Sequence, residues 1–304
     1  RSRGLGDVYK RQDGFPSQML AYGMYLSTAS GNIGSDSDYV NIHNNTLDVY
    51  GHTGVVTAGI RLSSNNSSGP GGNIYCNIGE TGTGNTITAT STSVPTNTYG
   101  IWEFATGDIF GTISENDMSG GITSVWDTNY GILLRTNGGD IGTSISPMNI
   151  SGNTFNIAST NGSTYGIFLS AEGGASDIYL GGAGYGIINN VFSVSSDNLN
   201  AYGLYCYAKG IISGNISAND MSGGISGEDY AYGIYVNAPD GTISADIWNS
   251  HSVTISATTL DAAGMFIMGD VISGTYGDTS YAVSYTHLRA HETVLDLVCR
   301  LLLE

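Results

Sequence analysis

The residues whose types and spacing come nearest to a metal site lie at the end of the chain. His287 and His291 are four residues apart, the spacing that places two imidazoles on one face of a helix. Cys299 follows in an apolar stretch with the pattern of a short helix. The Glu and the third ligand that complete known His-x-x-x-His zinc sites do not accompany the pair. The histidines are therefore a weak metal motif.

The two ends of the chain differ in composition from the rest and are related to each other. Residues 1–12 hold four of the nine Lys and Arg. A DNA string that encodes Val283–Thr293 has a reverse complement that, shifted by one base, encodes Ser2–Arg11. This DNA resembles the transposase adapter of sequencing libraries. We therefore expect residues 1–12 and 283–304 to be translated adapter without function, and the native termini to lie beyond both ends.

The segment between these ends, residues 13–282, is acidic and has the composition of a folded chain. The full sequence of 304 residues has a net charge of −17, 45 Gly and 20 Tyr. Aromatic and β-branched residues argue against disorder. Arg61, Arg135 and Lys209 are the only basic residues of the segment, which argues against nucleic acid as a partner. No apolar run reaches eighteen residues, so we predict no membrane-spanning helix, and the three Cys have no paired or metal-like spacing.

One short phrase recurs through this segment, in the forms AYGMYL, AGIRL, TYGIWEF, NYGILL, TYGIFL, AYGLYC, AYGIYV and AGMFIM. Each unit continues with a second element that opens on a small polar residue and Ile, and with a third that begins at Asn and alternates. Alternation of β-branched and aromatic residues between Gly, Asn and Asp predicts strands. The glycines of the phrase are 30 to 41 residues apart and are Gly23, Gly59, Gly100, Gly131, Gly166, Gly203, Gly233 and Gly264.

This repeat predicts an all-β, single-domain parallel β-helix (β-solenoid) over residues 13–282. We expect about eight right-handed coils of three short strands, stacked about 4.8 Å apart. No coil buries its apolar side alone, so each is stabilised by its neighbours. An additional YGI phrase at Gly186 leaves open an alternative with two short coils per unit.

Stacking turns each repeated position into a row of like residues. We expect the residue after each glycine and the residue two further on to form the core. Glu103 interrupts the second of these rows, and we expect a local shift there that turns Trp102 and Phe104 inward.

The position between the two core residues faces outward in this arrangement. Its aromatic members are candidate binding residues, because an exposed apolar strip marks an interaction surface for sugar rings or a partner strand. The alternative is that they stabilise the sheet by cross-strand packing or are covered by loops. The six candidates are Tyr25, Trp102, Phe168, Tyr205, Tyr235 and Phe266.

Two further rows are polar. An asparagine opens the third element in six units, and we predict a structural ladder in which stacked Asn side chains bond the neighbouring coil. Asp108, Asp140 and Asp177 share one position in three successive units and form a candidate Ca²⁺ site, because a cation relieves the repulsion between stacked carboxylates. The alternative is that these are exposed turn carboxylates. The ladder comprises Asn45, Asn85, Asn116, Asn153, Asn190 and Asn219, with His251 at the next equivalent position.

The phrases GTIS (at Gly111 and Gly241) and AYGIY (Ala21, Ala201 and Ala231) resemble the right-handed parallel β-helix repeat proteins. The resemblance is to autotransporter passengers and polymorphic outer-membrane repeat proteins of bacteria. It implies export, display at the bacterial outer surface and a role in adhesion, with a host or cell-surface glycan or protein as partner.

The rival class is the carbohydrate-active β-helix of the pectate lyase and polygalacturonase type. The NTD, DD, GHG and RIK strings of such enzymes do not occur, and the negative charge of the segment repels an anionic polysaccharide. The pairs Glu228–Asp229 and Glu115–Asp117 are candidate carboxylates for glycoside hydrolysis. We predict a non-enzymatic, extracellular β-solenoid, with the carbohydrate-active enzyme as the alternative.

Overall fold

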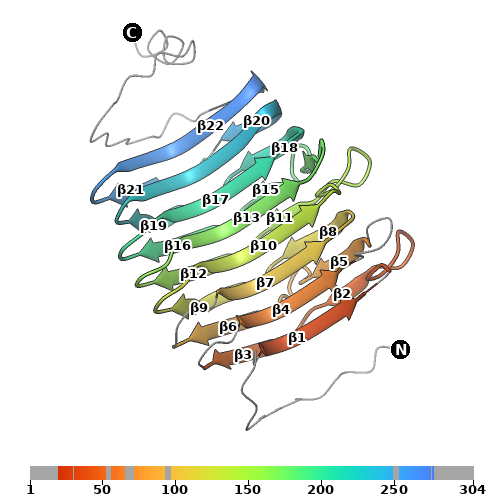
Figure 1. The fold of residues 1–304 in the computed structure, drawn as a ribbon, viewed down its shortest axis with the longest axis horizontal. Helices are drawn as coiled ribbons and strands as arrows, with labels where there is room; N and C mark the ends of the chain where they lie inside the picture. Colours follow the sequence, from red (N-terminus) through yellow and green to blue (C-terminus); the bar gives the residue numbers. More distant parts are fainter. Residues whose placement is uncertain are drawn as a thin grey trace.

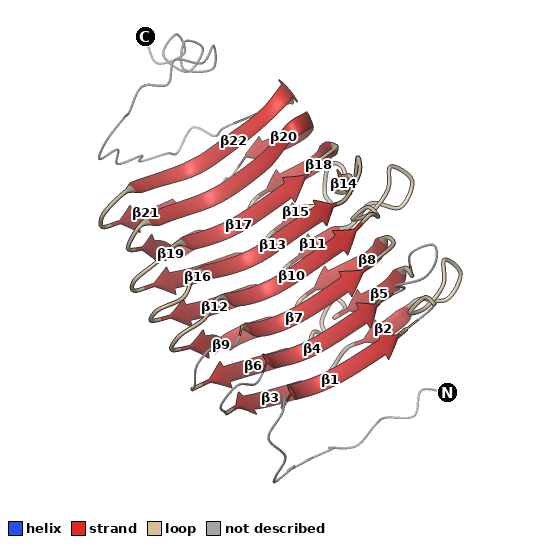
Figure 2. Ribbon diagram, in the orientation of Figure 1, coloured by secondary structure: helices blue, strands red, loops and turns tan. Residues whose placement is uncertain are grey.

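The computed structural model describes residues 20–29, 31–52, 56–65, 72–92, 97–248, 253–274 and 276. Within these residues every regular element is a β-strand and there is no helix (Figure 2). The strands wind into a solenoid of about seven turns, with β1 (Leu20–Thr28) and β22 (Asp261–Ser273) at opposite ends of the stack (Figure 1). The predicted all-β parallel solenoid is confirmed. The tail residues His287, His291 and Cys299 lie outside the described residues, as does His251.

Each complete turn contributes to three faces, and the strands of neighbouring turns pair in parallel. Face 1 carries the repeated glycine phrase and consists of β1, β4 (Val56–Ser64), β7 (Thr98–Ala105), β10 (Asn129–Asn137), β13 (Thr164–Glu172), β17 (Ala201–Ala208), the first part of β20 (Tyr230–Trp248) and β22. Face 2 consists of β2 (Val40–Ile42), β5 (Ile74–Ile78), β8 (Ile109–Ser114), β11 (Asn149–Ser151), β14 (Ile178–Tyr179), β15 (Ile187–Ile188), β18 (Ile211–Ser217) and the second part of β20. Face 3 consists of β3 (Thr46–Gly51), β6 (Thr86–Ser91), β9 (Asp117–Ser124), β12 (Thr154–Ser159), β16 (Val191–Ser196), β19 (Met221–Gly227) and β21 (Val253–Ala257).

The register shows that one repeat unit makes one turn. Tyr130 pairs with Tyr165, and Tyr165 pairs with Tyr202, so equivalent residues of successive units are neighbours. The alternative of two short coils per unit is therefore wrong. The additional phrase at Gly186 (φ 102°) lies in a loop that interrupts face 2 between β14 and β15. The eighth glycine phrase forms β22, which begins a further turn beyond the seven.

The repeated glycine is required by packing across the core. A Cβ on Gly131 would lie 2.5 Å from Cδ1 of Phe155, a face 3 residue, and 2.5 Å from the carbonyl oxygen of Gly166. Gly166 meets Phe192 and the carbonyl of Gly203 at the same distances. Real Cβ atoms do not approach other atoms this closely, so any larger residue would push face 3 away from face 1.

The two predicted core rows are buried in the inner turns, and their members in β1 and β22 are partly buried. Ile101, Ile132 and Ile167 of the first row and Leu62 and Leu134 of the second are fully buried. They pack against apolar residues of faces 2 and 3 in one continuous cluster that runs along the solenoid. The core prediction is confirmed, and burial of this kind supplies the main favourable free energy of folding.

The predicted shift at Glu103 is wrong. Glu103 stays in register between Leu62 and Leu134 and is 1% exposed, while Trp102 and Phe104 line a groove on the outer surface. The continuous parallel ladder holds the register, because a one-residue slip would move the whole strand to the other face. Neither carboxyl oxygen of Glu103 has a hydrogen-bond partner among the described residues. Burial without such partners raises the pKa of Glu103 to about 8.

We expect the free energy of unfolding to fall as the pH rises from about 5 to about 8. In this range the unfolded chain releases the Glu103 proton while the folded chain retains it, so the unfolded state binds fewer protons. Between the pKa of the unfolded chain and that of the folded chain, the free energy of unfolding falls by at most roughly 5 kcal/mol, because each pH unit changes it by about 1.4 kcal/mol. Chemical denaturation at a series of pH values measures this slope.

The Glu103→Leu variant has the same residue at this position as the two neighbouring turns, Leu62 and Leu134. It should remove the fall of the free energy of unfolding with pH and raise stability at pH 8. Glu80→Gln removes an exposed carboxylate and serves as the control, with the slope unchanged. A slope that persists in Glu103→Leu would show that another group is responsible.

Candidate functional site

Two parallel rows of aromatic side chains cover the outer side of face 1. One is the predicted row that contains Trp102, Phe168 and Tyr205. The second consists of the tyrosines that precede the glycines, and the sequence analysis missed it: Tyr22, Tyr99, Tyr130, Tyr165, Tyr202 and Tyr232. Strict alternation would turn these tyrosines inward with the core, but alternation breaks at the glycine. Gly131 faces Phe155, and Ile132 after it is also in the core, while Tyr130 before it packs on the outer side. The recurrence of Tyr before Gly was the signal that could have revealed them.

The rings within each row stack along the solenoid axis. Phe168 and Tyr205 have centroids 4.7 Å apart and planes 3° apart, and Tyr205 and Tyr235 continue the stack at 4.8 Å and 4°. Tyr165 and Tyr202 in the other row are 4.8 Å and 2° apart. Each such pair contributes about 0.5–1.5 kcal/mol. The predicted alternative of cross-strand packing therefore describes one role of these residues.

Rings of different rows meet edge to face. Tyr165 is inclined by 89° to Phe168, and Tyr202 by 90° to Tyr205. Parallel planes in contact are about 3.5 Å apart, so stacked rings with centroids 4.8 Å apart must be offset, and part of each ring face stays uncovered. The surface is a ridged herringbone of rings rather than a flat sheet of them.

The predicted binding residues differ in exposure. Tyr25 is 47% exposed, and the other five, Trp102, Phe168, Tyr205, Tyr235 and Phe266, are half-buried. Leu133, which is 7% exposed, interrupts their row between Trp102 and Phe168. The six candidates thus lie on one surface, but Arg61 separates Tyr25 from Trp102, and Leu133 separates Trp102 from the four rings that follow.

A groove of about 360 Å³ crosses β4, β7, β10 and β13 at this interruption. Its volume is within the range of small-molecule sites. The lining combines the rings with three charged side chains, and it comprises Arg61, Ser63, Asn65, Asn97, Tyr99, Trp102, Phe104, Tyr130, Leu133, Arg135, Phe168 and Glu172.

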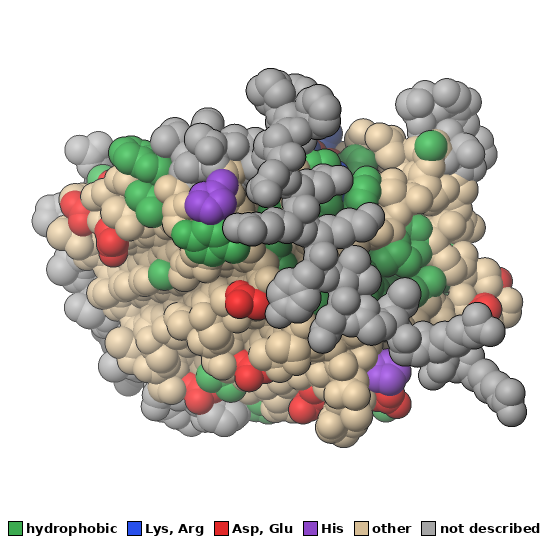
Figure 3. Space-filling model, turned by 90° about the horizontal axis from the view of Figure 1, so that it is seen from below, with side chains coloured by type: hydrophobic (Ala, Val, Ile, Leu, Met, Phe, Trp, Pro, Cys, Tyr) green, Lys and Arg blue, Asp and Glu red, His purple; other side chains and the backbone are tan. Residues whose placement is uncertain are grey.

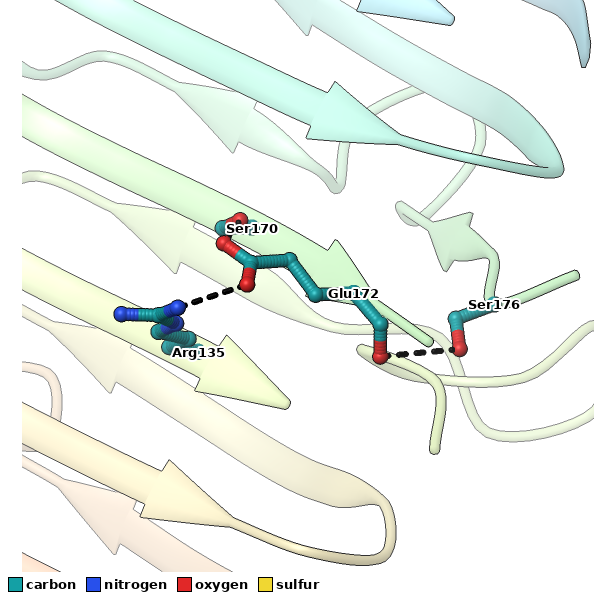
Figure 4. A network of polar contacts seen from close by, with 4 residues as sticks. All are labelled: Arg135, Ser170, Glu172 and Ser176. Atoms are coloured by element: carbon teal, nitrogen blue, oxygen red, sulfur yellow. Dashed lines mark hydrogen bonds and ion pairs between the residues drawn. The ribbon is translucent and has the colours of Figure 1, made fainter. Parts of the chain in front are cut away.

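The two arginines of the groove have different partners. Arg135 donates from Nη2 to Oε2 of Glu172 over 2.6 Å, and Ser170 donates to the other carboxyl oxygen (Figure 4). The guanidinium carbon of Arg61 lies 3.9 Å from the centroid of a Trp102 ring, and its Nη1 donates to the Tyr22 hydroxyl. Arg61 makes no ion pair with a described residue.

Most of the surface is uncharged or acidic. Figure 3 shows Asp and Glu scattered among uncharged side chains on one side of the molecule, with Lys and Arg almost absent from that view. Burial raises the pKa of Tyr99, Tyr130, Tyr165 and Tyr202, to about 12 for Tyr202. Their hydroxyls are therefore protonated at neutral pH.

Asp108, Asp140 and Asp177 form a ladder at the start of face 2. Oδ1 of Asp108 accepts the backbone N–H of Asp140 over 2.8 Å, and Oδ1 of Asp140 accepts that of Asp177 over 2.8 Å. Asn32 and Asn73 occupy the two preceding positions and bond in the same way. The residues are thus brought together, but as hydrogen-bond acceptors for the next coil. Among the described residues no group of three or more His, Cys, Asp or Glu side chains has a metal-binding arrangement.

The asparagine ladder lies at the turn between faces 2 and 3. Asn153 donates from Nδ2 to the Ile113 carbonyl (2.9 Å) and to Oδ1 of Asn190 (3.0 Å), and its own Oδ1 accepts from Asn116 (2.9 Å). The same pattern joins the residues from Asn45 to Asn219. The left-handed residue of the turn is the one before the ladder residue, for example Glu115 (φ 56°).

The candidate catalytic carboxylates take part in local structure. Asp117 accepts the Ser119 N–H over 2.8 Å, and Asp229 accepts the Thr259 hydroxyl over 2.9 Å. Cys76 and Cys206 are free and buried. A second hollow of about 490 Å³ lies beside Trp248 and Asp246 at face 2. None of the described segments forms a helix long and apolar enough to cross a bilayer.

The aspartate ladder generates a test of the calcium prediction. Desolvation and the neighbouring carboxylates raise the pKa of Asp140. We therefore expect Asp140→Asn, which keeps the acceptor as Asn73 does, to raise the melting temperature in calcium-free buffer at pH 7. Asp140→Ala removes the acceptor and should lower stability by about 1 kcal/mol.

If Ca²⁺ binds the ladder, the melting temperature of the unmodified protein rises with calcium concentration, and that of Asp140→Asn rises less. A destabilised Asp140→Asn variant in calcium-free buffer would contradict the view that the three carboxylates repel one another.

The chain was compared with protein-family models, with curated proteins and with solved structures, and none of the three comparisons found a match.

Proposed function

We propose that the protein is a non-catalytic, extracellular β-solenoid scaffold, of the kind found in adhesins and autotransporter passengers of the bacterial surface, and that face 1 binds a glycan. The observation that carries this proposal is the double row of aromatic side chains on face 1, which is unbroken from Phe168 to Phe266 in one row and from Tyr99 to Tyr232 in the other. Sugar rings present apolar C–H faces, which pack on aromatic surface, and polar hydroxyls, which bond to the rim.

The surface combines the two properties that such binding needs. Stacking and the covalent strand fix the rings before a ligand arrives, so little conformational entropy is lost on binding. Polar groups accompany them, since the Tyr99 hydroxyl accepts from Asn97 over 3.0 Å and the groove contains Ser63 and Asn65. Aromatic residues with a polar handle are typical of recognition surfaces.

A scaffold role is supported by the structural contacts of the candidate catalytic carboxylates. Asp117 bonds within its own turn, Asp229 bonds to Thr259 of the next turn, and Glu103, whose pKa is raised, is sealed in the core. An acidic surface of low positive charge also keeps a secreted rod soluble.

We expect the variant Tyr205→Ser, Tyr235→Ser, Phe266→Ser to lose binding on a glycan array or to cells by about tenfold or more. Three rings that contribute about 1 kcal/mol each would account for this loss. Tyr50→Ser with Tyr185→Ser is the control, because both tyrosines are exposed and lie away from face 1. Melting curves verify that the variants remain folded at the assay temperature.

Unchanged binding in the triple variant would contradict the role of face 1. Glycan cleavage by the unmodified protein that a single substitution, at Asp117 or Asp229, abolishes would favour the alternative of a carbohydrate-active enzyme.

A further inference from the structure

We propose that the groove on face 1 binds a saccharide that carries a carboxylate, with the carboxylate bound by Arg61 and the sugar ring seated over Leu133 between Trp102 and Phe168. This inference rests on the proposed function, because it names the ligand class at one part of the same aromatic surface. It is carried by the placement of charge and by the shape of the ring row.

The distribution of positive charge is the first observation. Arg61, Arg135 and Lys209 are the only Lys or Arg among the described residues, and two of the three line this groove. In a chain with a net charge of −17, such a concentration makes the groove the place where an anion is least repelled.

Arg61 differs from Arg135 in that its charge is not compensated. Glu172 neutralises Arg135, whereas no described carboxylate pairs with Arg61. Residues 53–55, 66–71 and 93–96, which adjoin β4 and β7 in the sequence and are not described, contain no Asp or Glu. A guanidinium that contacts rings on several sides is also partly desolvated, which strengthens its interaction with an anion.

The guanidinium of Arg61 is held in place before a ligand binds. Its central carbon lies 3.9 Å from a Trp102 ring and 5.2 Å from the rings of Tyr22 and Tyr25, and Tyr22 accepts a hydrogen bond from Nη1. Nε is buried without a partner among the described residues, which leaves the two terminal nitrogens, Nη1 and Nη2, as donors to a ligand. A planar fork with unused donors fits the two oxygens of a carboxylate.

The shape of the groove comes from a single aliphatic residue. In register, Leu133 lies between Trp102 and Phe168, whereas Arg61 takes the equivalent position between Tyr25 and Trp102, and the row from Phe168 to Phe266 consists of rings. A leucine is smaller than a ring, so it leaves a depression with aromatic walls. An apolar floor with polar groups at the rim suits one ring of a saccharide.

Titration calorimetry on the full chain with three probes tests the inference: 3′-sialyllactose, lactose and 3′-sulfated lactose. We expect sialyllactose to bind about tenfold to a hundredfold more tightly than lactose, because it adds one charged hydrogen-bonded contact. Added salt should weaken this preference. Lactose that binds as tightly as sialyllactose would overturn the inference, and so would sulfated lactose that binds as tightly.

Substitutions test separately the role of each arginine and the role of the depression over Leu133. Arg61→Gln should remove the preference for sialyllactose over lactose, whereas Lys209→Gln makes the same change of charge away from the groove and should leave it intact. Arg135→Gln should reduce it less than Arg61→Gln. Leu133→Phe places a ring between Trp102 and Phe168 without changing the charge and should weaken binding of both sugars. A preference that survives in Arg61→Gln, or falls equally in Lys209→Gln, overturns the assignment to Arg61.

Failure of the inference and failure of the proposed function give different results. If the glycan array shows binding that depends on Tyr205, Tyr235 and Phe266 but sialyllactose has no advantage over lactose, the proposed function stands and the inference fails. If the triple variant binds normally while Arg61→Gln loses sialyllactose, the groove is a site but the wider aromatic surface is not.

Discussion

The buried asparagine ladder is the contact on which the rest of the structure depends. Each side chain bonds the coil before it and the coil after it, as Asn153 does with Ile113 and Asn190. Because the amides are buried, a shift of one coil along the strand would leave several polar groups without partners. The ladder therefore fixes the register in which every other row of side chains stacks.

That register produces the core and the outer surface together. Once equivalent residues lie above one another, the glycine row lets face 3 pack against face 1, and the tyrosines before the glycines stack from Tyr99 to Tyr232. The same alignment places Asp108, Asp140 and Asp177 in one column, where backbone N–H groups offset part of their repulsion. A repeat that satisfies hydrogen bonding and burial at once thus also creates an extended aromatic face.

Much of the fold, and less of the site, could be predicted from the sequence. The solenoid and its core rows follow from the recurrence of the glycine phrase, because stacking needs only like residues at like positions. The tyrosine row could not be derived from alternation, since alternation breaks at the glycine and these residues pack on the outer side. Glu103 interrupts the apolar pattern of its row, but the parallel pairing of its strand with the neighbouring strands holds it in the core. The groove joins residues of four coils around Leu133, and no local motif marks it.

The central claim, that buried asparagines set the register, is tested most directly by comparing two substitutions. Asn153→Ala removes a buried ladder residue, and Asn198→Ala removes an exposed one that makes a similar bond of 2.7 Å to Asn161. Chemical denaturation should show a loss of roughly 3 kcal/mol or more for Asn153→Ala, because donors and acceptors of three coils lose partners. Asn198→Ala should change stability by less than about 0.5 kcal/mol. Equal losses for the two variants would contradict the account.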